Sequence, residues 1–203
     1  MTDAYELAAA FDDRLLVRPS SDVANLVDLS NAVATIAGVE DTQSTRDSRY
    51  FVDVIGPCDH LIFVAIDGLG MNTINAMDQD DFIPRHLEKE LSTVFPTSTP
   101  VVFTSLATGK WPGEHAIIGW DMYLGSVDFV ATIIRFIRRS DERFLGDIGL
   151  TSEQVFHSAS MTQRFRRNTL IMQPQEISNS VYSNYTSGGR PQVGYDTLDN
   201  AVD

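Results

Sequence analysis

The sequence is almost without cysteine, and this absence excludes two kinds of structure. Cys58 is the only cysteine among the 203 residues. One thiol cannot form an intrachain disulfide, and it cannot supply the sulfur ligands of a Cys-rich zinc site. We therefore expect a protein of a reducing compartment, the cytoplasm.

Lysine is nearly absent too, with Lys89 and Lys110 standing against 13 arginines. The 28 acidic residues give a formal net charge of -13. A surface with this excess of negative charge repels nucleic-acid phosphates and anionic lipids. We expect no nucleic-acid-binding surface.

The chain also has little that points to a membrane. No window reaches the run of about 18 apolar residues that a membrane-spanning helix needs. Residues 1–16 lack a basic leader followed by an apolar core. The sequence therefore predicts a soluble protein that is not exported.

Apolar residues make up 43% of the chain, which is ample for one packed core with appendages. Residues 4–16 and 22–37 carry apolar positions at helical spacing and predict packing helices. The segment "YFVDVI", residues 50–55, predicts a short strand, and "PRHLEKEL", residues 84–91, a short amphipathic helix.

The clearest element is "LIFVAI", residues 61–66, a continuous apolar run typical of a strand covered on both faces. The run ends at Asp67, after which Gly68 and Gly70 permit a tight turn into a helix from about Met71. Ligands of parallel α/β sheets gather at the carboxyl ends of strands. Asp67 is thus a candidate site residue, and the alternative is an ordinary turn or helix-capping aspartate.

A stretch rich in hydroxyl groups, "STVFPTSTPVVFTSLATG", covers residues 92–109. Its first part, "STVFP", predicts a second buried strand. Pro100 suits the first helical position with Thr99 as N-cap, and Gly109 suits the end of that helix. Thr99 would then lie at the same sheet edge as Asp67, either as a nucleophile or as a plain helix cap.

A helix N-terminus stabilises an anion by about 0.3–1 kcal/mol, which alone does not ionise an alcohol. A threonine nucleophile needs a base or a metal, and zinc lowers the pKa of bound water from about 15.7 to about 7. Asp67 would be a natural ligand for such a metal.

The ordered pieces Asp-Gly, Pro-Thr-x-Thr and Thr-Gly-x-x-Pro-x-x-His resemble the type I phosphodiesterase and nucleotide pyrophosphatase family of the alkaline phosphatase superfamily. The resemblance covers about residues 61–123. It implies an α/β fold with a central, mostly parallel sheet flanked by helices. It also implies hydrolysis of phosphate esters or nucleotides with two divalent metal ions, usually zinc and alternatively manganese.

Carried over by position, Asp67 resembles the carboxylate that binds one metal. Thr99 resembles the nucleophile that binds the same metal and carries the phosphoryl group, and Thr97 is the alternative nucleophile. The family's phosphate-binding Asn is replaced by Trp120, with Asp121 beside it, so these two are the candidate substrate-binding residues. His115 matches a histidine that is usually structural in the family.

The family takes further aspartate and histidine ligands from later segments, and this chain has no Asp-His pair after Thr99. We therefore expect the chain to be truncated and inactive alone. The expected division is residues 1–123 as the first half of the catalytic domain, 124–190 as an inserted cap-like region, and 191–203 as the return to the core.

Three further expectations concern the rest of the chain. "SVDFVATIIRF", residues 126–136, predicts β-structure, residues 152–167 a helix, and residues 171–189 an irregular stretch. Arg164, Arg166 and Arg167 could meet a phosphate, although a solvated helix face is the alternative. An exposed strand edge in a truncated sheet would favour a homo-oligomer.

Two other readings stay open from the sequence alone. A related enzyme of the superfamily could act on phosphomonoesters, phosphonates or sulfate esters, because the nucleophile and the first aspartate are shared. The chain could also be a non-catalytic remnant or interaction module that retains the fold.

Overall fold

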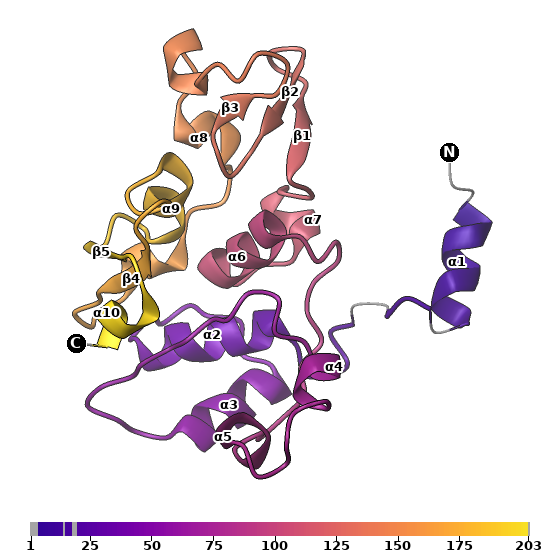
Figure 1. The fold of residues 1–203 in the computed structure, drawn as a ribbon, viewed down its shortest axis with the longest axis vertical. Helices are drawn as coiled ribbons and strands as arrows, with labels where there is room; N and C mark the ends of the chain where they lie inside the picture. The colour runs from indigo at the N-terminus through magenta and orange to yellow at the C-terminus, as the bar shows by residue number, and fades with distance from the viewer. Residues whose placement is uncertain (1–3, 14, 18–19, 203) are drawn as a thin grey trace.

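The computed structural model describes residues 4–13, 15–17 and 20–202, as mixed α/β structure with short strands (Figure 1). The α-helices are α1 Ala4–Asp12, α2 Leu26–Ile36, α3 Arg46–Ile55, α4 Met71–Ile74, α5 Phe82–Arg85, α6 Thr99–Thr108, α7 Pro112–His115, α8 Ser152–Val155, α9 Val181–Thr186 and α10 Leu198–Val202. Two 3-10 helices are η1 Leu145–Ile148 and η2 Met161–Arg164. The strands are β1 Asp121–Leu124, β2 Phe129–Thr132, β3 Ile137–Arg138, β4 Ile171–Pro174 and β5 Gln192–Tyr195.

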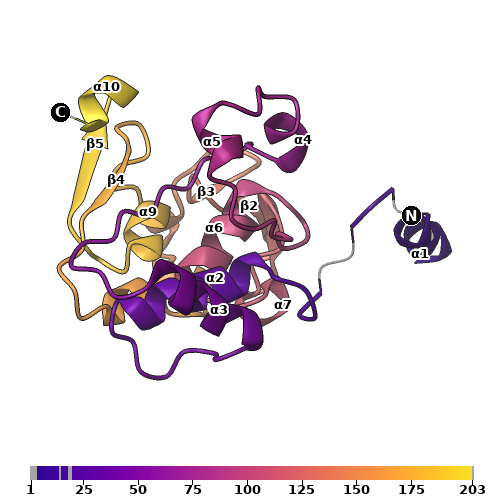
Figure 2. The same ribbon diagram turned by 90° about the horizontal axis from the view of Figure 1, so that it is seen from below.

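Helix α6 lies at the centre of the arrangement and packs against α2, α7, α9 and η2. Figure 1 shows it between α2 on one side and the β1–β3 hairpin region on the other. The view from below in Figure 2 places α2, α3 and α6 together, with α1 well apart from them. Elements from the first and last thirds of the chain thus meet on one helix.

Helices α2 and α3 form a pair whose starts are set by side-chain caps. Asn25 accepts a hydrogen bond from the amide of Asp28 at the start of α2. Thr45 and Ser48 form a reciprocal capping box at the start of α3. The prediction of a strand over residues 50–55 is wrong, because this box begins a helix at Arg46 that packs Phe51 against α2.

The sheets are small and do not form the central, mostly parallel sheet that the sequence predicts. Strands β1, β2 and β3 make an antiparallel sheet with Asp121 opposite Thr132. Strands β4 and β5 make a two-stranded parallel pair with Ile171 opposite Gln192. The described residues form no other multi-residue ladder.

Residues 61–66 are the main departure from the sequence expectation. The segment is irregular and mostly exposed, with Ile62 86% and Val64 70% accessible. A covered strand needs hydrogen-bonded neighbours on its edges, and neither sheet of the described chain includes these residues. The predicted buried strand is therefore wrong for this structure.

The second predicted strand survives only as an isolated parallel bridge between Asn25 and Ser92. Its predicted burial holds for one residue, Val94, whereas Phe95 is 41% exposed. Val94 is 1% exposed and packs in a cluster with Val27 and Val101, so it anchors the segment that leads into α6.

The helix predicted over residues 84–91 is wrong, because α5 ends at Arg85. Other expectations are met in part. The helix predicted over residues 22–37 is α2, and β-structure over residues 126–136 appears as β2. The helix predicted over residues 152–167 is broken into α8 and η2, because Phe156 and Ser160 adopt extended backbone between them. The stretch 171–189 holds β4 and α9.

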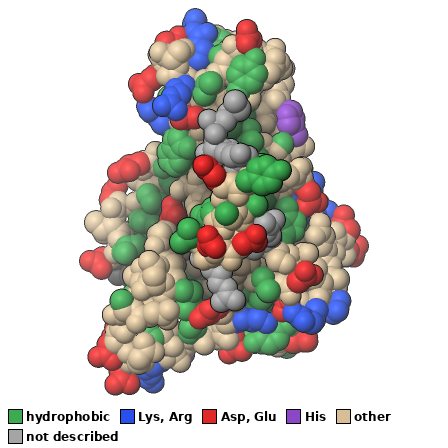
Figure 3. Space-filling model, turned by 90° about the vertical axis from the view of Figure 1, so that its right-hand side faces the viewer, with side chains coloured by type: hydrophobic (Ala, Val, Ile, Leu, Met, Phe, Trp, Pro, Cys, Tyr) green, Lys and Arg blue, Asp and Glu red, His purple; other side chains and the backbone are tan. Residues whose placement is uncertain are grey.

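The residues after Ile117 form the largest apolar cluster. Ile133, Phe136 and Leu145 are at most 2% exposed there, and Tyr182 from α9 joins them. Figure 3 shows one outer face, where carboxylates are spread over the length of the molecule. Within the part of the chain described, no helix is both long and apolar enough to cross a bilayer.

Replacing Ile133 with alanine should lower the free energy of unfolding by about 2–5 kcal/mol, because a fully buried side chain leaves a cavity. Replacing Ile62 with alanine should cost about 0.5 kcal/mol or less, because the side chain is exposed. Urea unfolding midpoints measure both. Equal losses for the two variants would show that residues 61–66 are buried.

Candidate active site

Two residues that the sequence predicts as one site meet in the structure. The Thr99 Oγ1 hydroxyl donates a hydrogen bond to Asp67 Oδ2 at 3.1 Å. Asp67 is exposed and Thr99 is half-buried, so the pair is open to solvent. The Asp67 carboxylate and the Thr99 hydroxyl, which are 32 residues apart in the sequence, are thus in direct hydrogen-bond contact.

The turn after Asp67 depends on glycine. Gly68 has φ of 77°, a left-handed conformation that other residues adopt only with strain. The chain then enters α4, which begins at Met71 as predicted but extends only to Ile74. The glycine turn therefore leaves Asp67 on an irregular, exposed corner.

The other half of the site is the N-terminus of α6. Ser98 is the N-cap and Thr99 the first helical residue, one position from the expected cap. The amides of Val101 and Val102 donate to the Ser98 carbonyl oxygen, each at 3.0 Å. Pro100 is the second helical residue, one position later than predicted, and Gly109 ends the helix with φ of 64° as predicted.

Two polar groups at the start of α6 have no hydrogen-bond partner within the described residues. One is the Thr99 backbone amide, and the other is the buried Ser98 hydroxyl. Free amides at a helix N-terminus attract anions. The Thr99 amide can thus donate a hydrogen bond to an oxygen of a negatively charged group.

The remaining hydroxyls of α6 are used inside the protein. Thr104 Oγ1 contacts the Tyr182 phenol at 3.0 Å, and Thr108 Oγ1 donates to the Thr104 carbonyl oxygen at 2.7 Å. Ser105 Oγ lies 2.9 Å from His115 Nε2. Thr99 is distinguished from them because its hydroxyl faces a solvent-exposed carboxylate.

His115 is a buried structural residue, as the resemblance implied. The Ile117 amide donates to His115 Nδ1 at 3.1 Å, so Nε2 carries the proton and donates to Ser105 Oγ. Burial lowers the pKa of His115 to about 4. Both ring nitrogens therefore form hydrogen bonds, one to Ser105 of α6 and the other to the Ile117 amide after α7.

Trp120 and Asp121 lie at the start of the hairpin. The Trp120 side chain is 44% exposed. Asp121 accepts a hydrogen bond from Thr132 Oγ1 at 2.6 Å and forms an ion pair with Arg139. No hydrogen bond within the described chain joins either residue to Thr99 or Asp67.

The three arginines considered for phosphate binding have other partners. Arg164 pairs with Asp41 at 2.5 Å and Arg166 with Glu40 at 2.7 Å. Arg167 donates to the carbonyl oxygens of Ile36 and Asp59. They join the η2 region to the end of α2, and the pKa of Asp41 is lowered by its hydrogen bond to Arg164.

The oxygens of Asp67 and Thr99 suit a hard or borderline divalent cation. Zinc binds oxygen at about 2.0–2.2 Å, so two oxygens 3.1 Å apart can both reach one ion. No group of three or more His, Cys, Asp or Glu side chains that could hold a metal is found among residues 4–13, 15–17 and 20–202. The pair fits part of a metal site.

The chain belongs to the type I phosphodiesterase / nucleotide pyrophosphatase family, whose model matches residues 61–203. This match includes Asp67, Thr99 and the later α/β region. The family consists of hydrolytic enzymes that are generally metal-dependent and act on small phosphate esters or nucleotides. No curated protein and no solved structure matches the chain.

Sequence reasoning missed Tyr182 and Ser98. Tyr182 donates to the Pro100 carbonyl oxygen at 2.8 Å across 82 residues, and no periodic pattern encodes that contact. Ser98 could have been found as the residue before the first helical position, because serine is a common N-cap.

The stability of the protein should fall as pH is lowered from about 6.5 towards 4. The unfolded chain binds a proton at His115 near the ordinary pKa of 6.5, whereas the folded protein resists it down to about 4. The loss should be on the order of 3 kcal/mol. Urea unfolding as a function of pH measures it.

The His115→Gln variant should lose most of this pH dependence, because it has no titrating ring. His157→Gln is the matched control, since His157 is exposed. An unchanged pH profile in His115→Gln would contradict the assignment.

Proposed function

We propose that this protein hydrolyses phosphodiester or pyrophosphate bonds with Thr99 as the nucleophile, through a phospho-threonine intermediate. The observation that carries the proposal is the hydrogen bond from Thr99 Oγ1 to Asp67 Oδ2 at the N-terminus of α6. The family match over residues 61–203 supports the reaction class.

In the proposed reaction the Thr99 hydroxyl loses its proton to solvent and its oxygen forms a bond to phosphorus. The bond to the leaving oxygen breaks at the same time, and the leaving group takes up a proton from solvent. Water then cleaves the Thr99–phosphorus bond and restores the hydroxyl. The Asp67 carboxylate orients the Thr99 hydroxyl, and the unpaired Thr99 amide favours the negative oxygens of the phosphoryl group.

Asp67 and Thr99 would hold a divalent ion, with zinc the first candidate and manganese the second. Such ions lower the pKa of a bound hydroxyl group and neutralise charge on the phosphate. Two ions need about three protein ligands each. Because this pair supplies two oxygens, we infer that residues 1–203 alone have little or no activity.

Trp120 and Asp121 are proposed to contact the substrate. Trp120 offers an exposed aromatic face in the position where the resemblance places a phosphate-binding residue. Asp121 is fixed beside it by Thr132 and Arg139. Trp120 and Asp121 stand where the family has an asparagine side chain, and this difference favours a substrate other than a simple nucleotide diester.

The division at residues 123 and 190, the alkaline phosphatase-like fold and the cytoplasmic location remain predictions. Exposed apolar residues 61–66 favour pairing with another copy of the chain.

A non-catalytic role is favoured by one observation, the lack of three grouped ligands among the described residues.

In any form of the protein that cleaves bis-p-nitrophenyl phosphate with added zinc or manganese, Thr99→Ala should reduce kcat/KM by about a thousandfold or more. The reason is that the variant lacks the attacking oxygen. Thr97→Ala, two residues earlier, is the matched control and should lose less than about tenfold, as expected for a residue outside the reaction.

Removal of metal by a chelator should abolish the same activity. If Thr97→Ala is the inactive variant, the nucleophile is assigned to the wrong threonine. If residues 1–203 show robust turnover that depends on Thr99, the inference that they are inactive alone is wrong.

A further inference from the structure

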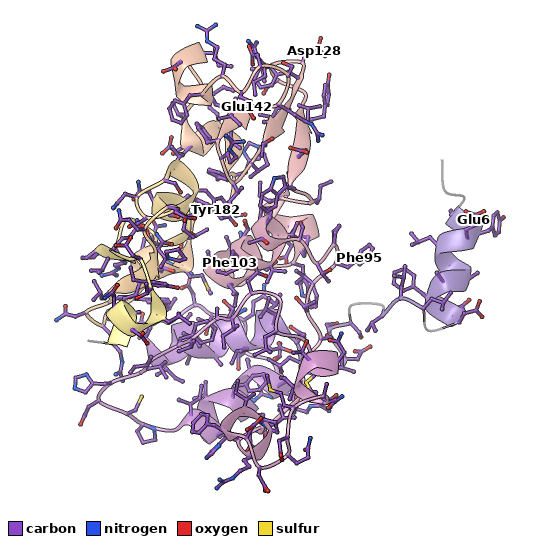
Figure 4. The ribbon with its side chains drawn as sticks, viewed as in Figure 1. Glu6, Phe95, Phe103, Asp128, Glu142 and Tyr182 are labelled. Carbon is purple, nitrogen blue, oxygen red and sulfur yellow. The ribbon has the colours of Figure 1, made fainter. Side chains whose placement is uncertain are left out.

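Helix α9, from the region after the hairpin, reaches the first turn of α6 through one side chain. The Tyr182 phenol donates a hydrogen bond to the Pro100 carbonyl oxygen at 2.8 Å. Pro100 directly follows Thr99 in the chain. Figure 4 shows Tyr182 of α9 and Phe103 of α6 on neighbouring elements.

The direction of the hydrogen bonds around Tyr182 is determined by its single proton. Because that proton goes to Pro100, the phenol oxygen accepts from Thr104 Oγ1 at 3.0 Å. Thr104 is fully buried and Tyr182 is 4% exposed. The phenol therefore bridges two positions of α6, one of them adjacent to Thr99.

Aromatic neighbours hold the Tyr182 ring in place. Phe156 lies edge-to-face with it at a centroid distance of 5.8 Å, and Tyr185 stacks on Phe156 at 4.2 Å. Burial raises the pKa of Tyr182, so the phenol keeps its proton and remains a donor. A rigid ring makes the bond to Pro100 directional.

We propose that Tyr182 is a positioning residue: by holding the Pro100 carbonyl, it orients the first turn of α6 and so places the Thr99 hydroxyl against Asp67. This inference rests on the proposed function, which makes Thr99 the nucleophile. The hydrogen bond from Tyr182 to the Pro100 carbonyl oxygen does not depend on that function. The region after the hairpin would thereby control the geometry of the site from behind α6.

Tyr185 provides a matched control on the same helix. Its phenol donates to the Ser158 carbonyl oxygen at 2.8 Å, which lies outside α6. Tyr182→Phe and Tyr185→Phe each remove one hydroxyl group that is hydrogen-bonded to a backbone carbonyl oxygen. Both keep the ring, so ring-current effects are preserved.

The test is NMR of threonine methyl groups in the 203-residue chain, with the Thr99 signal assigned by its loss in Thr99→Ala. Tyr182→Phe should shift the signals of both Thr104 and Thr99. Tyr185→Phe should shift neither. A purely structural role for Tyr182 would move Thr104, its direct partner, and leave Thr99 unchanged, which would overturn the proposal.

A second measurement covers the case in which Tyr182→Phe does not fold. In the unmodified protein the Tyr182 phenolic proton should exchange slowly with water and show a cross-peak to Thr104. Rapid exchange would mean that the bond to Pro100 is not maintained, and the proposal would fail.

Neither measurement requires turnover, so failure of the proposed function is separable. If Thr99→Ala retains activity while the Thr99 signal responds to Tyr182→Phe, the positioning stands and the nucleophile assignment fails. In an active form, Tyr182→Phe should lower kcat about tenfold with KM unchanged, whereas Tyr185→Phe should leave both constants unchanged.

Discussion

The need to pair the buried polar groups of α6 is the constraint on which the rest of the structure depends. A buried hydroxyl without a partner costs about 1–3 kcal/mol, so each inward-facing group of this helix requires one. Thr104 meets Tyr182 and Ser105 meets His115. The surrounding elements are thereby held to α6 by directional bonds as well as by apolar packing.

This constraint also explains why Thr99 is different. The helix begins where the chain emerges towards solvent, and the Thr99 hydroxyl finds the exposed carboxylate of Asp67 instead of an interior partner. An open site on a firmly held helix suits a nucleophile, because the scaffold is rigid and the reacting group is accessible. The proposed chemistry uses the hydroxyl of α6 that faces Asp67 and, among the described residues, has no partner in the interior.

The sequence predicted α6 to within one residue of its start, because proline, glycine and hydroxyl residues act locally at helix ends. It also predicted that Asp67 lies near Thr99, but the two meet by a hydrogen bond and not at the edge of a shared sheet. It failed for residues 61–66, whose apolar character predicts a covered strand but cannot show whether strands are available to cover it. It also failed for α3, where the capping box at Thr45 outweighed a short β-like pattern. The Tyr182 contact depends on packing between distant segments, which single-sequence patterns do not reveal.

We propose that Asp67 and Thr99 bind one metal ion together, and zinc titration by calorimetry tests this most directly. The measurement compares the unmodified chain with Asp67→Asn, Thr99→Ala and the double variant. If the two oxygens share an ion, Asp67→Asn should weaken zinc binding by about tenfold. Thr99→Ala should then weaken zinc binding less in the Asp67→Asn variant than it does in the unmodified chain. Fully additive losses, or unchanged affinity in Asp67→Asn, would contradict the account.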